Sequence, residues 1–141
     1  MNKTNRVLCL VSLLAFSMSA QAARLALQDC AHLNSDHPEK AKRYLMCLDG
    51  NIELLERERK TWITKLVMDT ENLQKETGNS QLLPIIQRSF INQERYMEDA
   101  CRWRYLKQMP NATLAAKVYK RCKIEFIKQH TVELQADFLV Q

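Results

Sequence analysis

Four cysteines after position 22, placed as two pairs around two turn signals, constrain this fold more than any other feature of the sequence. The midpoint of the first pair falls within the stretch 36–39, and the midpoint of the second pair falls beside Pro110. Residues equidistant from the turn of an antiparallel helical hairpin face each other. Each pair would close a loop of about 15–20 residues, which stabilises a fold by roughly 3 kcal/mol. We therefore predict two disulfides, Cys30–Cys47 and Cys101–Cys122.

The first 22 residues have the organisation of a cleaved signal peptide. Two cations precede an apolar run at 7–16, and the stretch ends in Ala20-Gln21-Ala22, the pattern of a signal-peptidase site. The apolar run is too short to span a bilayer, so we expect residues 23–141 to form a single exported domain that does not span the membrane and resides in the periplasm. Cleavage removes Cys9 and leaves an even number of cysteines in an oxidising compartment, where disulfides form.

The composition favours helices. The chain has only two glycines, Gly50 and Gly78, whereas Leu, Glu, Lys and Gln are abundant and β-branched residues are few. The 119 residues after the signal peptide are enough for one modest core. We predict an all-α fold, a small helical bundle of two disulfide-stapled antiparallel helical hairpins.

The first hairpin is expected to contain a short helix at 23–34 and then a long one. Asp36 and Glu39 have the spacing of a capping box, and Gly78 reads as the stop of the long helix. Gly50 marks a potential kink, because glycine inside a helix costs roughly 1 kcal/mol. The predicted apolar stripe of the long helix is Leu45, Leu48, Ile52, Leu55, Trp62, Leu66 and Leu73.

The second hairpin is expected to join two helices at Pro110. Ser80 or Leu83 caps its first helix, and Asn111 or Thr113 caps its second. The first helix has one apolar stripe of Leu83, Ile86, Phe90, Met97, Cys101 and Tyr105. Its second stripe, which we expect to pack against the first hairpin, is Tyr96, Ala100, Trp103 and Leu106. The buried side of the last helix is predicted to be Val118, Cys122, Phe126, Ile127, Leu134 and Phe138.

Motifs for catalysis, metal binding or cofactor binding are not found. The cysteines are assigned to disulfides, and the sequence has no nucleophile turn and no C-x-x-C. Asp29, His32, Asp36 and His37 lie close together, but their spacing matches no standard zinc pattern, so a solvated turn is the preferred interpretation. We predict a protein that is not an enzyme.

The charge is uneven along the chain. Residues 101–128 hold eight basic residues and one acid, whereas residues 23–100 hold eleven basic and thirteen acidic. This asymmetry fits either an anionic partner, such as an acidic protein or an envelope component, or a solvated face, and nucleic acid is not expected. Trp103 is either core or a binding anchor. The candidate partner-binding residues are Arg102, Trp103, Arg104, Lys107, Lys120 and Arg121.

Three stretches carry a family resemblance. They are "LMCLDGNIELLERERKTW" at 45–62, "QERYMEDAC" at 93–101 and "YKRCKIEFIKQHTVEL" at 119–134. With Cys30, they resemble the exported LprI-like lysozyme-inhibitor domain family over most of residues 28–136. The resemblance implies a small four-cysteine helical protein that binds another protein outside the cytoplasm, and some members inhibit lysozyme.

Two functions follow as hypotheses. The first is inhibition of lysozyme or another cell-wall hydrolase, which an exposed Trp103 beside the 107–113 loop would favour. Host lysozymes are strongly basic and would be repelled by the basic hairpin, so inhibition would need that anchor or the acidic side. The alternative is an accessory, pilotin-like factor for envelope assembly or secretion, which an apolar groove able to hold a partner helix would favour. The candidate acidic side is Glu53, Glu56, Glu71 and Glu76.

Overall fold

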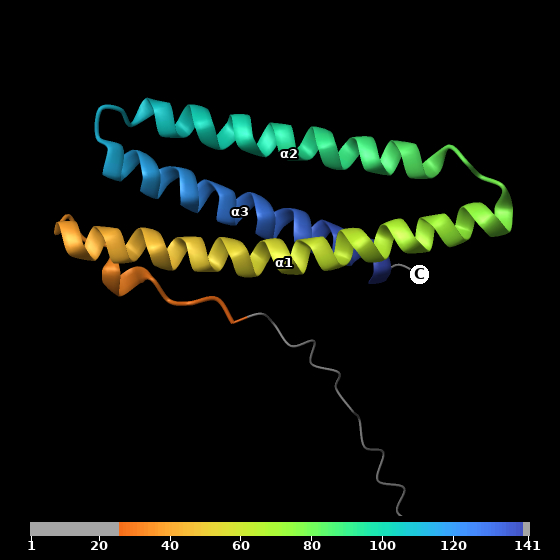
Figure 1. Cartoon of the computed structure of the whole chain (residues 1–141), viewed down its shortest axis with the longest axis horizontal. Coiled ribbons are helices and arrows are strands. Elements are labelled where there is room, and N and C mark those ends of the chain that lie inside the picture. Colours follow the sequence, from red (N-terminus) through yellow and green to blue (C-terminus); the bar gives the residue numbers. More distant parts are fainter. Residues whose placement is uncertain (1–25, 140–141) are drawn as a thin grey trace, which may run out of the picture.

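The structure, a computed structural model, describes residues 26–139, and the predicted signal peptide lies outside them. Within that range it is helical without strands, which confirms the all-α prediction (Figure 1). The elements are the 3₁₀ helix η1 at Ala31–Leu33 and the α-helices α1 at Pro38–Thr77, α2 at Leu82–Lys107 and α3 at Ala112–Leu139.

Two of the predicted helix boundaries are confirmed. Gly78 ends α1 with a left-handed backbone, φ 73°, which glycine adopts without steric cost. Asn111 caps α3, because its Oδ1 accepts the backbone N–H of Leu114 at 3.0 Å. No kink appears at Gly50, since α1 runs unbroken through it.

The starts of α1 and α2 differ from the prediction. His37 is the N-cap of α1 and makes no side-chain capping bond, so the helix begins one residue later than predicted and the capping box expected for Asp36 and Glu39 is not formed. Gln81, and not Ser80 or Leu83, is the N-cap of α2. Proline lies in the first turn of both helices, where its missing N–H leaves no intrahelical bond unmade.

Both predicted disulfides are present. The Cα atoms are 5.9 Å apart in Cys30–Cys47 and 5.6 Å apart in Cys101–Cys122. The second disulfide joins α2 to α3, as expected. The first joins α1 to a segment that is helical only at Ala31–Leu33, so the helix predicted at 23–34 is wrong over its described part.

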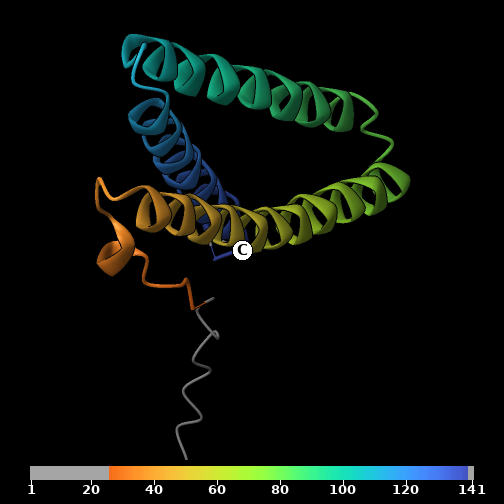
Figure 2. The same ribbon diagram turned by 60° about the vertical axis from the view of Figure 1, so that its left-hand side comes forward.

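Helix α3 lies between α1 and α2 and packs against both, whereas α1 and α2 pack least against each other. From the loop that joins them, α1 and α2 spread apart toward the other end of the molecule (Figure 2). The core runs along α3 and includes Leu48, Leu55, Met97, Cys101, Ile124 and Ile127.

The second stripe of α2 is the main correction to the predicted core. Only Ala100 is buried, whereas the exposed fraction is 65% for Tyr96, 52% for Trp103 and 58% for Leu106. These three side chains lie outside the side of α2 that carries the buried Met97 and Cys101, and α2 packs more against α3 than against α1. Leu73, near the end of α1, is also exposed, at 41%.

Candidate functional site

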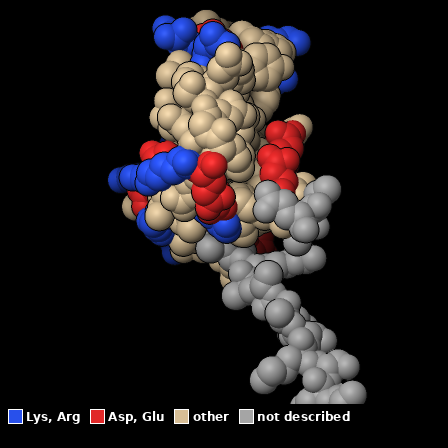
Figure 3. Space-filling model, turned by 90° about the vertical axis from the view of Figure 1, so that its right-hand side faces the viewer, with Lys and Arg blue, Asp and Glu red and all other residues tan. Residues whose placement is uncertain are grey.

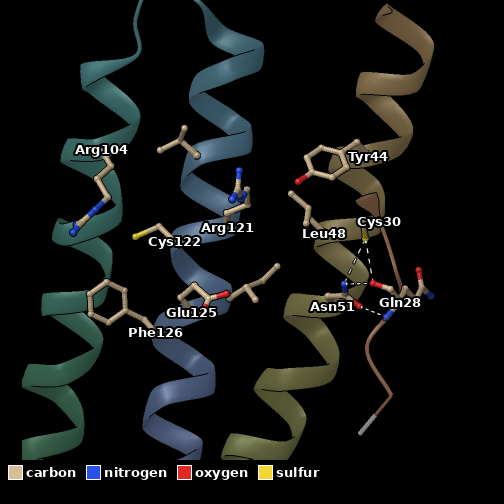
Figure 4. Close-up of a pocket in the computed structure, with 12 residues that line it drawn as sticks. Gln28, Cys30, Tyr44, Leu48, Asn51, Arg104, Arg121, Cys122, Glu125 and Phe126 are labelled. Atoms are coloured by element: carbon tan, nitrogen blue, oxygen red, sulfur yellow. Dashed lines mark hydrogen bonds between the residues drawn. The ribbon is translucent and has the colours of Figure 1, made fainter. Parts of the chain in front are cut away.

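A groove runs along α3 beside the core, and core residues such as Leu48 and Ile124 form part of its lining. Its volume is about 640 Å³, and its floor is a row of α3 side chains that includes Val118, Arg121 and Glu125. One wall is α1 together with the segment before η1, and Arg104 of α2 stands on the other side (Figure 4). We call this the α3 groove; its lining residues are Gln28, Cys30, Tyr44, Leu48, Asn51, Arg104, Val118, Arg121, Cys122, Ile124, Glu125 and Phe126.

The wall on the α1 side is fixed by one disulfide and one amide. Cys30 is bonded to Cys47 of α1, which ties the extended segment to the helix. Asn51 is buried and holds the backbone of Gln28 twice, accepting its N–H at 2.8 Å and donating to its carbonyl oxygen at 3.0 Å. A side chain thus satisfies the backbone N–H and carbonyl of Gln28, which a helix in this segment would have used for its own bonds.

On the α2 side, the second disulfide brings Cys122 to the groove. Arg104 donates to the carbonyl oxygen of Ala100 at 2.5 Å, and its guanidinium lies 4.3 Å from the ring centre of Trp103. The two contacts restrain a long side chain that would otherwise be mobile. Phe126, on the same side of α3, meets Tyr96 edge-on with ring centres 5.6 Å apart.

The electrostatics of the groove favour a negatively charged ligand. Arg104 and Arg121 line it, against one carboxylate, Glu125. Among residues 26–139, neither arginine forms a salt bridge. The carboxylate of Glu125 pairs instead with Lys128, with 3.8 Å between Oε1 and Nζ. The remaining lining is largely apolar. A ligand with an apolar face and a carboxylate would therefore find partners for both.

The six predicted partner-binding residues separate into three groups. Arg104 and Arg121 line the α3 groove, and Arg102, Trp103 and Lys107 are exposed on α2. Lys120 forms an ion pair with Asp49 of α1, which closes the bundle near the groove. Sequence reasoning missed Gln28, Tyr44 and Asn51. The sequence offered one signal for them: Asn51 lies on the apolar side of a predicted helix, and a buried amide requires hydrogen-bond partners from another segment.

A second polar cluster lies where the three helices meet, beyond the groove. Arg59 of α1 contacts Glu56 at 2.7 Å and Glu94 of α2 at 2.9 Å. Burial opposes the charge of Arg59, but the bonds to Glu94 and Glu56 raise its pKa overall. His130 of α3 is buried beside Phe90, and its Nδ1 atom has no hydrogen-bond partner. Burial, and secondarily the charge of Arg59, lowers the pKa of His130.

The turn at 29–37, which was weighed as a metal site, gains no support for that interpretation. Among the described residues, His, Cys, Asp and Glu side chains do not gather in any set of three or more suited to a metal ion. Asp29 instead accepts the backbone N–H of Ala31 at 2.9 Å. Within the same part of the chain, none of the helices has a stretch that is both long enough and apolar enough to cross a bilayer.

Comparison with protein-family models, with curated proteins and with solved structures gives no match to this chain.

Proposed function

We propose that this chain is an exported, non-enzymatic binding protein that holds an amphipathic helix of a partner protein in the α3 groove. This is the pilotin-like accessory function. Placement in the periplasm and likeness to the LprI-like family are parts of the same proposal; the two disulfides are compatible with an oxidising compartment.

The observation that carries the proposal is a largely apolar groove lining that includes two arginines, neither of which forms a salt bridge among residues 26–139. A helix laid along α3 between the spread ends of α1 and α2 would complete the packing of a four-helix bundle. Its apolar face would cover Val118 and Phe126, and a carboxylate would reach Arg104 or Arg121. Charge-assisted bonds of arginine to carboxylate are about twice as strong as neutral hydrogen bonds.

Two designed peptide helices test this. They share one apolar face, and one carries Glu where the other carries Lys. We expect the Glu peptide to bind. The double variant Arg104→Gln/Arg121→Gln should lower the affinity for this peptide at least tenfold, which is about 1.4 kcal/mol of binding free energy. The matched control, Arg57→Gln/Lys60→Gln, removes the same charge from exposed positions of α1 and should leave binding unchanged. Equal binding of both peptides, or of neither, would contradict the proposal.

A second candidate, inhibition of lysozyme, rests on the exposed Trp103. Arg104 stacks on its ring, so the indole is held in place while 52% of the residue stays exposed, beside the turn that follows α2. An aromatic side chain of this kind can anchor a protein in a partner's cleft. The assay is inhibition of one strongly basic and one less basic lysozyme by the oxidised protein. Inhibition should be lost in Trp103→Ala and kept in Ile85→Ala, which alters an equally exposed residue; no inhibition of either enzyme would reject this candidate.

A further inference from the structure

The outer face of α2 carries exposed apolar side chains along its whole length. At 100° per residue, Ile85, Tyr96 and Trp103 fall within about 20° of one another around the helix. The buried residues Met97 and Cys101 lie on the side that packs against α3. The exposed fractions of the apolar side chains are 52% for Ile85, 54% for Ile91, 65% for Tyr96, 52% for Trp103 and 58% for Leu106.

Three arginines at seven-residue spacing lie on the neighbouring part of the exposed surface of α2, about 60–100° around the helix from Ile85 and Trp103. Arg88, Arg95 and Arg102 are all exposed, and the rise of an α-helix places them about 10.5 Å apart. None of them forms a salt bridge within residues 26–139. The acids nearby on α2 are Asp99 and Glu98, and Glu98 already accepts a hydrogen bond from α3 at 2.7 Å. We call the three arginines and the five exposed apolar residues the α2 ridge.

The shape of the molecule leaves this ridge accessible to a flat surface. Helix α2 forms one outer edge of the molecule over its full length, with α3 and α1 on its other side (Figures 1 and 2). Viewed end-on, Lys and Arg side chains lie at the upper edge with an acidic side chain among them, and both basic and acidic side chains lie lower (Figure 3). The ridge is thus convex and cationic, and no other element of residues 26–139 covers it.

We propose that the α2 ridge docks on a membrane surface rich in anionic lipid headgroups. Arginines beside exposed Trp, Tyr, Ile and Leu side chains are the pattern of a helix that lies in the headgroup region of a bilayer. The regular cations complement a surface with many negative charges. The ridge adjoins the α3 groove, because Tyr96 contacts Phe126 of the groove lining and Arg104 of the groove stacks on Trp103. The two proposals are still tested separately, because the ridge variant described below leaves Arg104 and Arg121 unchanged.

The test is flotation of the oxidised full chain with lipid vesicles. One preparation contains phosphatidylcholine alone, and the other contains phosphatidylcholine with phosphatidylglycerol. We expect binding to the anionic vesicles only, and its loss at high salt. The triple variant Arg88→Gln/Arg95→Gln/Arg102→Gln should weaken it at least tenfold, since each cation near an anionic surface contributes about fivefold. The matched control, Arg57→Gln/Lys60→Gln/Lys75→Gln, removes the same charge from α1.

Brominated lipids provide a second readout. Quenching of tryptophan fluorescence by brominated phosphatidylcholine in the anionic vesicles should occur in the native chain and disappear in Trp103→Phe, because Trp62 lies on α1. The triple ridge variant and the α1 control should both keep the native helical circular dichroism, because the substituted side chains are exposed. The proposal is overturned if the chain does not float with anionic vesicles, if the α1 control loses binding as much as the ridge variant, or if Trp103 is not quenched.

Discussion

Asn51 of α1 hydrogen bonds to Gln28 through both atoms of its amide, at 2.8 Å and 3.0 Å, across 23 residues of sequence. This pair, together with the neighbouring disulfide, holds an extended segment against a helix and so forms one wall of the α3 groove. The segment before η1 is therefore held by specific polar contacts and one disulfide, whereas Tyr44 and Leu48 of the same wall are buried in the core.

Replacing Asn51 with Ala should destabilise the protein and loosen the wall. The change removes the two hydrogen bonds to Gln28 and a longer one from Nδ2 to Cys30 Sγ at 3.5 Å. It leaves two backbone groups of Gln28 without partners, which we expect to cost about 2 kcal/mol. Denaturant unfolding of the oxidised protein measures the change. Asn72→Ala, at an exposed position of the same helix, is the control and should change stability by less than about 0.5 kcal/mol.

Removing each disulfide should separate stability from binding. Cys30→Ala/Cys47→Ala and Cys101→Ala/Cys122→Ala should each lower the free energy of unfolding by about 3 kcal/mol, since the bonded residues are 17 and 21 positions apart. The first variant should also lower the affinity for the Glu peptide, because the groove wall loses its covalent link to α1. Unfolding curves and peptide titrations measure the two effects, and unchanged peptide affinity would show that this wall does not contribute to binding.

The stability of the fold should depend on pH through His130. Because burial, and then Arg59, lowers its pKa below 6.5, the unfolded chain takes up a proton before the folded chain does as the pH falls. Glu133, Glu94 and Glu56 oppose the shift without cancelling it. The stability is thus fully present above about pH 6.5 and declines as the pH falls toward the lowered pKa.

Denaturant midpoints measured on both sides of about pH 6.5 test this dependence. In His130→Gln the decline below that pH should become smaller, because the titrating group is gone. His32→Gln, an exposed histidine on η1, should retain the native decline. An equal decline in the native chain and in His130→Gln would mean that other groups cause it.

Arg59 should act on both stability and the titration of His130. It forms the salt bridge that joins α1 to α2 in the described chain, and its side chain is only 12% exposed. Arg59→Met leaves Glu94 and Glu56 without this partner, and we expect a loss of about 1–3 kcal/mol. Histidine NMR titration should show the pKa of His130 rising toward its ordinary value, since one positive charge that lowers it is removed. A purely structural arginine would leave that pKa where it is.

The parts of the fold that the sequence predicted are those with short-range causes. The two disulfides followed from the symmetry of cysteines about turns, and the end of α1 followed from Gly78, because a left-handed residue there favours glycine. Asn111 was one of two candidate caps, and only the structure distinguished it from Thr113. The capping box at Asp36 was wrong, since several polar residues near a helix start can each fit the pattern.

The α3 groove and the α2 ridge could not be derived in the same way. Periodicity places Trp103 on an apolar stripe of α2, but it does not say whether a neighbouring helix covers that stripe. The answer depends on α3 lying between α1 and α2, which is a property of how three helices pack. Likewise, Arg104 and Arg121 belong to different helices, and their common position at one groove follows from the packing of α2 against α3.

By itself, the sequence determined the helical class, the cysteine pairing and the turns, because these depend on neighbouring residues and on helical period. Tertiary structure alone decided which apolar faces are buried, how the segment before η1 is held, and which charges share a surface. The physical reason is that burial and charge pairing are set by contacts between elements far apart in the chain, such as Asn51 with Gln28 and Lys120 with Asp49. An apolar stripe indicates that a helix can be covered, and only the packing shows by what.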